Sequence, residues 1–174
     1  MPVPSCQLET DLPWGLVRYR VCGEGREVVF LHGMLGAGSQ WNAVMGRLAE
    51  EFRCWALEMP GISFSDAPAD LTLPGLTHWL QAALAALGVA PYALLGSSWG
   101  GEAALHFALH AAPERRPRRL VLAAPAHPCW QPTLGQRFLL RPLPARCGAW
   151  LGARAPAGWQ RRLLARCYAD ATRI

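Results

Sequence analysis

The order of apolar and polar residues along the chain predicts strands that alternate with helices. Two early strands are expected at residues 7–10 and 16–22, and in the second one Val17, Tyr19 and Val21 alternate with arginines. This alternation predicts an antiparallel hairpin with one exposed face. Four later apolar runs are continuous, as strands covered on both faces require, at residues 28–31, 54–57, 92–95 and 120–124.

Three segments between these runs have helical periodicity. They lie at residues 40–51, 76–87 and 101–112. Ser39 is expected to cap the first of these helices, and Gly88 is expected to end the second. The inner stripe of the first helix is expected to consist of Trp41, Val44, Met45 and Leu48. The alternation predicts an α/β fold with a mostly parallel sheet that helices cover on both faces.

Composition and charge narrow the classes of function. With 174 residues, of which 52% are hydrophobic, the chain is long enough to bury a core, and disorder is excluded. All 17 basic residues are arginine, so we attribute the net charge of +5 to coding bias rather than to a nucleic-acid surface. No segment resembles a nucleic-acid-binding module, so no nucleic-acid partner is expected.

The cysteines and the N-terminal segment bear on cofactors and location. Six cysteines are scattered without the spacing of a metal site, so we expect reduced, partly buried thiols and no metal or other cofactor. The first residues lack the pattern of a signal peptide, and no apolar run reaches the roughly 18 residues of a membrane helix. We therefore expect a cytoplasmic protein.

The segment GSSWG at residues 96–100 joins an apolar strand directly to an Ala-rich helical segment. In this context the pattern G-x-S-x-G predicts a nucleophile elbow, a sharp turn whose central serine takes a strained backbone conformation. Gly96 and Gly100 would leave the space that this turn needs. Ser98 is the candidate nucleophile, above a helix N-terminus whose partial positive charge favours an anion. The alternative is a Gly/Ser turn without a catalytic role.

Three motifs, in this order, resemble those of the α/β-hydrolase family. They are FLHGM at residues 30–34, EMPGISFS at residues 58–65 and GSSWGG at residues 96–101. The resemblance covers about residues 16–128, although the family usually has Asp in place of Glu58 and Gly in place of Ser63. It implies the N-terminal six strands of an α/β-hydrolase core in residues 1–128 and part of a helical cap, or lid, in residues 129–174.

The resemblance also implies roles for the residues around Ser98. By position, the oxyanion hole is formed by the backbone N–H groups of Met34 and Trp99, and we expect both side chains to line the acyl pocket. His32, which precedes Gly33, matches a family position that shapes the oxyanion loop. We therefore expect His32 to brace this loop rather than to act as a base.

The acid and the histidine of a catalytic triad follow the nucleophile in this family, and neither has an obvious counterpart here. His127 follows the apolar run at 120–124. We favour a loop histidine at the pocket mouth over a general base, because no partner that would orient it is evident. No histidine follows His127, and Asp170 is the carboxylate that remains downstream. The chain therefore resembles a C-terminally incomplete hydrolase, with an exposed sheet edge open to self-association.

The sequence predicts a serine hydrolase that acts on an ester or related acyl bond of a small molecule. A catalytically inactive fragment or a binding protein is the alternative. The arginines of residues 137–166, interleaved with Leu and Trp, raise a third hypothesis, contact with an anionic lipid surface. The solvated face of cap helices explains the same pattern, and we favour it over a membrane contact.

Overall fold

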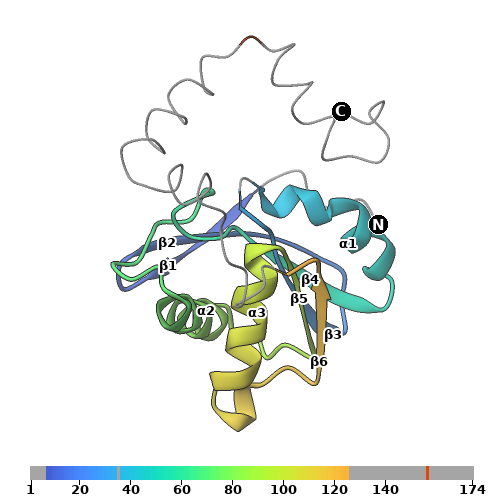
Figure 1. Ribbon diagram of the computed structural model, residues 1–174. Coiled ribbons are helices and arrows are strands. Elements are labelled where there is room, and N and C mark those ends of the chain that lie inside the picture. Colours follow the sequence, from blue (N-terminus) through green and yellow to red (C-terminus); the bar gives the residue numbers. More distant parts are fainter. Residues whose placement is uncertain (1–6, 35, 126–155, 157–174) are drawn as a thin grey trace. The chain divides into compact units, whose positions relative to one another are not determined.

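The computed structural model describes residues 7–34, 36–125 and 156; the first two ranges belong to Met1–Pro128, the first of two compact units. One mixed sheet has the strand order β1-β2-β4-β3-β5-β6 (Figure 1). The strands are β1 (Leu8–Leu12), β2 (Gly15–Cys22), β3 (Arg26–Leu31), β4 (Phe52–Leu57), β5 (Ala93–Ser97) and β6 (Arg119–Ala123). The hairpin β1–β2 and the pair β2–β4 are antiparallel, whereas the other pairs are parallel. The predicted α/β fold with a mostly parallel sheet is confirmed.

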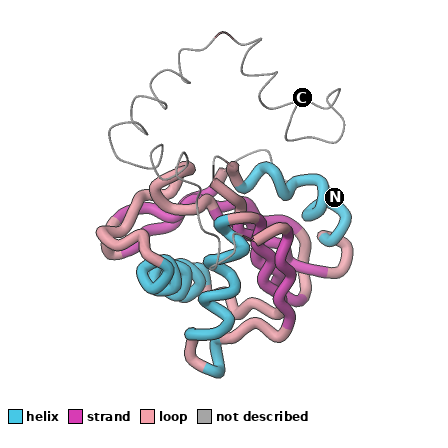
Figure 2. Tube along the Cα trace, in the orientation of Figure 1, coloured by secondary structure: helices cyan, strands magenta, loops and turns pink. Residues whose placement is uncertain are grey.

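Helices cover both faces of this sheet (Figures 1 and 2). They are α1 (Asn42–Leu48), α2 (Leu73–Leu87) and α3 (Trp99–His110), and two short 3-10 helices are η1 (Gly38–Trp41) and η2 (Pro113–Arg115). Helices α2 and α3 lie on one face, and α1 lies on the other. The expected cap, residues 129–174, lies outside the described residues apart from Pro156.

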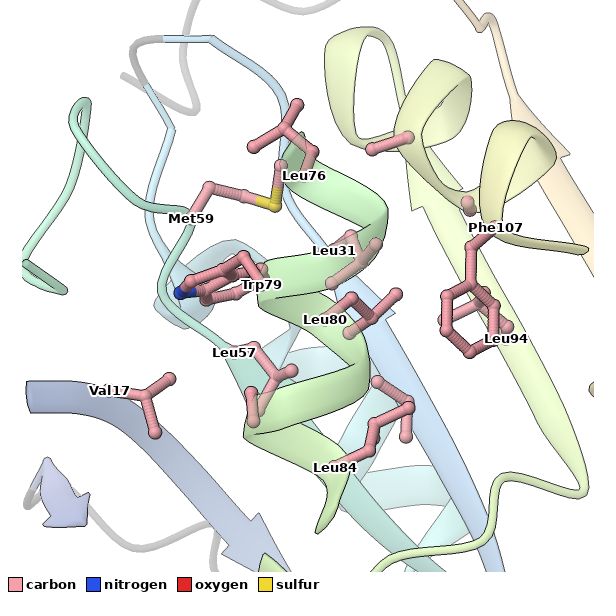
Figure 3. Packing of buried hydrophobic residues seen from close by; sticks show 14 of the residues in the cluster. Val17, Leu31, Leu57, Met59, Leu76, Trp79, Leu80, Leu84, Leu94 and Phe107 are labelled. Atoms are coloured by element: carbon pink, nitrogen blue, oxygen red, sulfur yellow. The ribbon is translucent and has the colours of Figure 1, made fainter. Parts of the chain in front are cut away.

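Two apolar clusters hold these layers together, one on each face of the sheet. Along β3, Val29 and Leu31 belong to the cluster under α2 and α3, whereas Val28 and Phe30 belong to the cluster under α1. Figure 3 shows the first cluster, in which side chains of α2 and α3 pack on the strands. The central strands are therefore buried on both faces, as their continuous apolar runs predict.

The predicted start of the first helix, at residue 40, is wrong, because α1 begins at Asn42. Ser39 lies within η1, and α1 begins after Trp41 without a side-chain cap. Val44 is 39% exposed and does not belong to the buried stripe, whereas Met45 is fully buried. The tight turn of η1 changes which side chains of the segment face the sheet, because three residues rather than 3.6 complete each turn.

The other two helices also differ from the predicted ranges. Helix α2 begins three residues early because the Thr72 side chain accepts a hydrogen bond from Gly75 N and Pro74 occupies the first turn. It ends as predicted at Gly88, which is left-handed with φ 66°. Helix α3 begins at Trp99, directly after the elbow, and ends at His110, two residues before the predicted end.

The last predicted strand is present but is not buried on both faces. Among the described residues β6 pairs only with β5, and Val121 is 50% exposed. Half-buried and exposed residues alternate along this strand, so the expectation of a buried strand was wrong for the part of the chain described.

None of the described helices is long and apolar enough to cross a bilayer.

We predict that the cluster beneath α2 supplies much of the stability. Replacing Leu80, which is 1% exposed, with alanine should lower the free energy of unfolding by about 2–5 kcal/mol, because apolar contacts are lost and a cavity remains. The matched change Leu109→Ala, at a helical leucine that is 60% exposed, should cost about 0.5 kcal/mol or less. Urea unfolding of both variants measures the difference, and equal losses would contradict this assignment of the core.

Candidate functional site

Ser98 is the single residue between strand β5 and helix α3. Strand β5 ends at Ser97, α3 begins at Trp99, and Ser98 occupies the N-cap position with φ 51° and ψ −120°. A positive φ is unfavourable for a residue with a Cβ, and such strain persists only where the surrounding structure enforces it. The side chain is exposed at the end of the sheet to which the parallel strands point. The backbone therefore has the strained turn that the elbow motif predicts.

Two glycines make this turn possible. A Cβ on Gly96 would collide with the carbonyl oxygen of Gly100 and would lie 2.6 Å from the Cα of Gly101. A Cβ on Gly100 would collide with the carbonyl oxygen of His32 and would lie 2.7 Å from that of Leu31. The first turn of α3 thus lies directly against β5 and the end of β3, and neither position has space for a side chain.

The segment after β3 lies beside Ser98. A Cβ on Gly33 would be 3.0 Å from the Cβ of Ser98 and 3.6 Å from its Oγ. Met34 follows, and its side chain is 60% exposed. The N–H of Trp99 is at the first helical position, where no intrahelical acceptor exists. The structure thus places Gly33, which precedes Met34, and Trp99 next to Ser98, while the roles of the two expected oxyanion donors, Met34 and Trp99, stay predictions.

His32 is fully buried and both of its ring nitrogens have partners. Nδ1 lies 2.8 Å from the carbonyl oxygen of Gly33, and Nε2 accepts a hydrogen bond of 2.8 Å from Met59 N. A carbonyl only accepts, so Nδ1 carries the proton and the ring is neutral in this arrangement. His32 joins the segment after β3 to the segment after β4. This geometry fits the expected bracing role.

Glu58 is a second buried polar group in the same region. Its Oε2 accepts hydrogen bonds from Gly38 N, at 2.9 Å, and from the hydroxyl of Ser63, and lies 3.5 Å from Nε2 of His32. Oε1 lies 4.0 Å from Nε of Arg20. Burial alone would raise the pKa of the Glu58 carboxyl, but its polar neighbours His32, Ser63 and Gly38 hold it below the ordinary value of 4.5. We ascribe this mainly to Ser63 and Gly38, since Met59 N occupies Nε2 of His32.

Sequence reasoning missed this buried carboxylate and misplaced one arginine. The alternation along β2 predicts that Arg20 faces solvent, yet its side chain is only 14% exposed and faces Glu58. The signal available in the sequence was the joint presence of Glu58 and Ser63 in one motif. Their hydrogen bond joins the two positions at which this motif departs from the family pattern.

The other histidines that follow Ser98 are distant from it or lie outside the described residues. His106 and His110 lie eight and twelve residues after Ser98 on α3, roughly 12 and 18 Å along the helix axis. His127 falls among residues that the structure does not describe. Within the described ranges, no three His, Cys, Asp or Glu side chains form a group that could hold a metal ion.

A surface hollow of about 650 Å³ lies at the opposite end of β5 from Ser98. Gln81, Leu84, Tyr92, Phe107, Arg115 and Arg118 are among the residues that line it. Tyr92 precedes β5, whereas Ser98 follows that strand. This hollow is therefore not the acyl pocket expected above Ser98.

Comparison with known proteins places residues 27–157 on the family model for the alpha/beta hydrolase fold. Pimeloyl-[acyl-carrier protein] methyl ester esterase of Nitrosomonas europaea is 32% identical over 114 residues, which cover 66% of this chain and 42% of that protein. 2-Succinyl-6-hydroxy-2,4-cyclohexadiene-1-carboxylate synthase of Serratia proteamaculans is 29% identical over 107 residues, which cover 62% and 36%. The chain thus spans about two fifths of the length of these curated relatives.

Among solved structures, naproxen esterase from Bacillus subtilis is similar with a TM-score of 0.75 and 21% identity. The similarity covers 99% of this chain and 57% of that one. At this level of identity it supports the fold alone.

We predict that the close approach at Gly100 cannot be relaxed. Gly100→Ala should lower the free energy of unfolding by about 3 kcal/mol or more, because the new Cβ would overlap two backbone carbonyls. Gly88→Ala is the matched control, since that site is open and only its positive φ is unfavourable, at about 1 kcal/mol. Thermal unfolding compares the two variants. A cost at Gly100 no larger than at Gly88 would contradict the packing described.

We predict a pH dependence from Glu58. Because its pKa is lower in the folded protein than the ordinary 4.5, the ionised carboxylate stabilises the fold above about pH 4.5. This contribution is lost as the pH falls through the folded-state pKa. The stability difference between wild type and Glu58→Gln should therefore shrink between pH 6 and pH 3 in urea titrations.

Glu50→Gln, at an exposed position, controls for the change in net charge. A difference between wild type and Glu58→Gln that stays constant across this pH range would contradict the lowered pKa.

Proposed function

Because the chain belongs to the α/β-hydrolase fold family, we propose that it is a serine hydrolase in which Ser98 is the nucleophile. The strained backbone at Ser98, φ 51° between β5 and α3, is the observation that carries this proposal. A serine in this position presents its hydroxyl at the end of the sheet, free of the strand and of the helix. That exposure is what attack on a substrate carbonyl requires.

In the proposed reaction, Oγ of Ser98 bonds to the carbonyl carbon of an ester and the carbonyl oxygen becomes an oxyanion. The N–H groups of Met34 and Trp99 would donate to that oxygen, each contributing roughly 3 kcal/mol to the transition state. The positive end of α3 adds to this stabilisation. The Ser98 proton passes to a base and from it to the leaving oxygen, so that the bond between the carbonyl carbon and that oxygen breaks and the alcohol leaves; water then hydrolyses the acyl-enzyme.

An ester of a carboxylic acid is the substrate class that we propose. The similarity to a methyl ester esterase supports an ester rather than an amide or an epoxide. A second relative is named as a synthase, so membership of the family alone does not select the reaction. The open position of Ser98 is compatible with a small acyl group.

We do not assign the base that accepts the Ser98 proton to His32, the histidine near this turn in the described part of the chain. Both nitrogens of His32 have hydrogen-bond partners in the buried loop, so this ring is not free to accept a proton. We propose that the base and the acid follow Ser98 in chain order, as is usual for the fold. His127 is the one histidine of the sequence that follows α3, and Asp170 is a carboxylate further downstream.

The lack of a base that can be assigned among the described residues favours a second candidate function. Without a base, the hydroxyl of Ser98 stays protonated at neutral pH and turnover is slow, so the chain would bind ester-like ligands rather than process them. The oxyanion donors and substrate binding alone leave roughly 10³- to 10⁴-fold acceleration over water in a comparable serine enzyme. The rate of ester hydrolysis therefore distinguishes a slow enzyme from a protein that only binds esters.

We predict slow hydrolysis of p-nitrophenyl acetate and butyrate by this chain, above the rate of the buffer. Any slow rate that the oxyanion donors and binding supply alone would persist in Ser98→Ala, but because no nucleophile remains this variant should not form the acyl-enzyme. Ser97→Ala, which changes the neighbouring serine at the end of β5, should still form it. Initial rates and the mass of a trapped acyl-enzyme measure both effects.

An acyl-enzyme that persists in Ser98→Ala would contradict the assignment of Ser98, and the absence of an acyl-enzyme in all three proteins would favour the binding function. Fast turnover that is lost in both Ser98→Ala and His127→Ala would identify His127 as the base.

A further inference from the structure

We propose that Glu58 and Ser63 are a coupled pair of positioning residues that hold residues 32–34 and 36–38, and with them the N–H of Met34, beside Ser98. This inference rests on the proposed function, because it assigns a task to groups behind the proposed oxyanion hole. Neither residue touches the reacting atoms. They act through Gly38 and the nearby Gly36, whose N–H donates to the carbonyl oxygen of Gly33, the residue before Met34.

His32 and Gly38, the first and the last of these residues, are both hydrogen-bonded to the segment that follows β4. Nε2 of His32 accepts a hydrogen bond of 2.8 Å from Met59 N. Gly38 N donates to Oε2 of Glu58 over 2.9 Å. Between them, Gly36 N donates to the carbonyl oxygen of Gly33 over 3.0 Å. Gly33 takes part in this turn and precedes Met34, so we infer that the attachments at His32 and Gly38 restrict where the N–H of Met34 points.

Ser63 holds the carboxylate in the position that Gly38 needs. Its hydroxyl donates to Oε2 of Glu58, and its own N–H donates to the carbonyl oxygen of Met59 over 3.2 Å. Oε2 therefore has donors from two different loops, while the carboxylate is fully buried. A buried acceptor that lost one of these donors would move toward another, because an unsatisfied buried charge is costly.

There is little spare room around this carboxylate. A Cβ on Gly38 would lie 2.9 Å from Oε1 of Glu58, so the backbone of the loop and the carboxylate are in direct contact. A shorter side chain at position 58 could not reach Gly38 N and the Ser63 hydroxyl together. The two residues therefore depend on each other, and their substitutions should not be additive.

The test compares the variants Ser63→Gly, Glu58→Asp and their double mutant. Ser63→Thr keeps the hydroxyl and serves as the conservative rescue. Ser65→Ala is the matched control, because Ser65 is a buried serine of the same loop whose hydroxyl accepts from Arg18 N instead of contacting Glu58. Each variant is made in the full 174-residue chain.

The first readout is hydrogen exchange of single amides, followed by NMR. Loss of either partner should reduce the protection of Gly38 N–H about tenfold, whereas Leu94 N–H in β5 should be unaffected. Ser63→Thr and Ser65→Ala should leave both amides unchanged. Protection of Gly38 that is equal in wild type, Ser63→Gly and Glu58→Asp would overturn the proposal, whether or not the protein is an enzyme.

The second readout is the labelling of Ser98 by a fluorophosphonate probe, resolved into probe binding and bond formation. Each single substitution should slow bond formation about tenfold with little change in binding, and the double mutant should be no slower than the worse single. Strictly additive losses, or unchanged bond formation in both single variants, would overturn the coupling. If wild-type Ser98 is never labelled, the proposed nucleophile fails, while the amide measurement still decides on the pair.

Discussion

The close packing of α3 against β5 and the end of β3 is the constraint on which the rest of the site depends. Gly100 lies against the carbonyl oxygens of Leu31 and His32, and Gly96 lies against the first turn of the helix. This contact forces Ser98 into a strained conformation at the helix N-terminus. It also brings the segment after β3 next to the serine, so one steric condition places both the proposed nucleophile and the proposed oxyanion donors.

Electrostatics imposes a second condition on this region. A site that stabilises an oxyanion is weakened by an uncompensated negative charge nearby, and Glu58 is a buried carboxylate attached to the same loop. Hydrogen bonds from Gly38 and Ser63, together with Arg20 at 4.0 Å, offset its charge. The carboxylate thereby orders the loop without presenting an open negative charge to Ser98. Buried charges are tolerated when they are paired and hydrogen-bonded in this way.

Much of the fold was predictable because its signals are local. Continuous apolar runs identify the central strands, and the spacing of Gly96 and Gly100 around Ser98 identifies the elbow. The missed features depend on contacts between distant segments. The burial of Glu58 requires β2, β4 and the loop after β3 to meet, which no local pattern expresses. The early start of α2, by contrast, has a local signal in the sequence, because a threonine such as Thr72 is a common helix cap.

The most direct test of this account is a crystal structure of the chain after reaction with a small phosphonate ester. We expect phosphorus bonded to Oγ of Ser98, and its non-bridging oxygen within hydrogen-bond distance of the backbone nitrogens of Met34 and Trp99. An adduct on another residue would contradict the account. So would an adduct on Ser98 whose oxygen points away from both nitrogens.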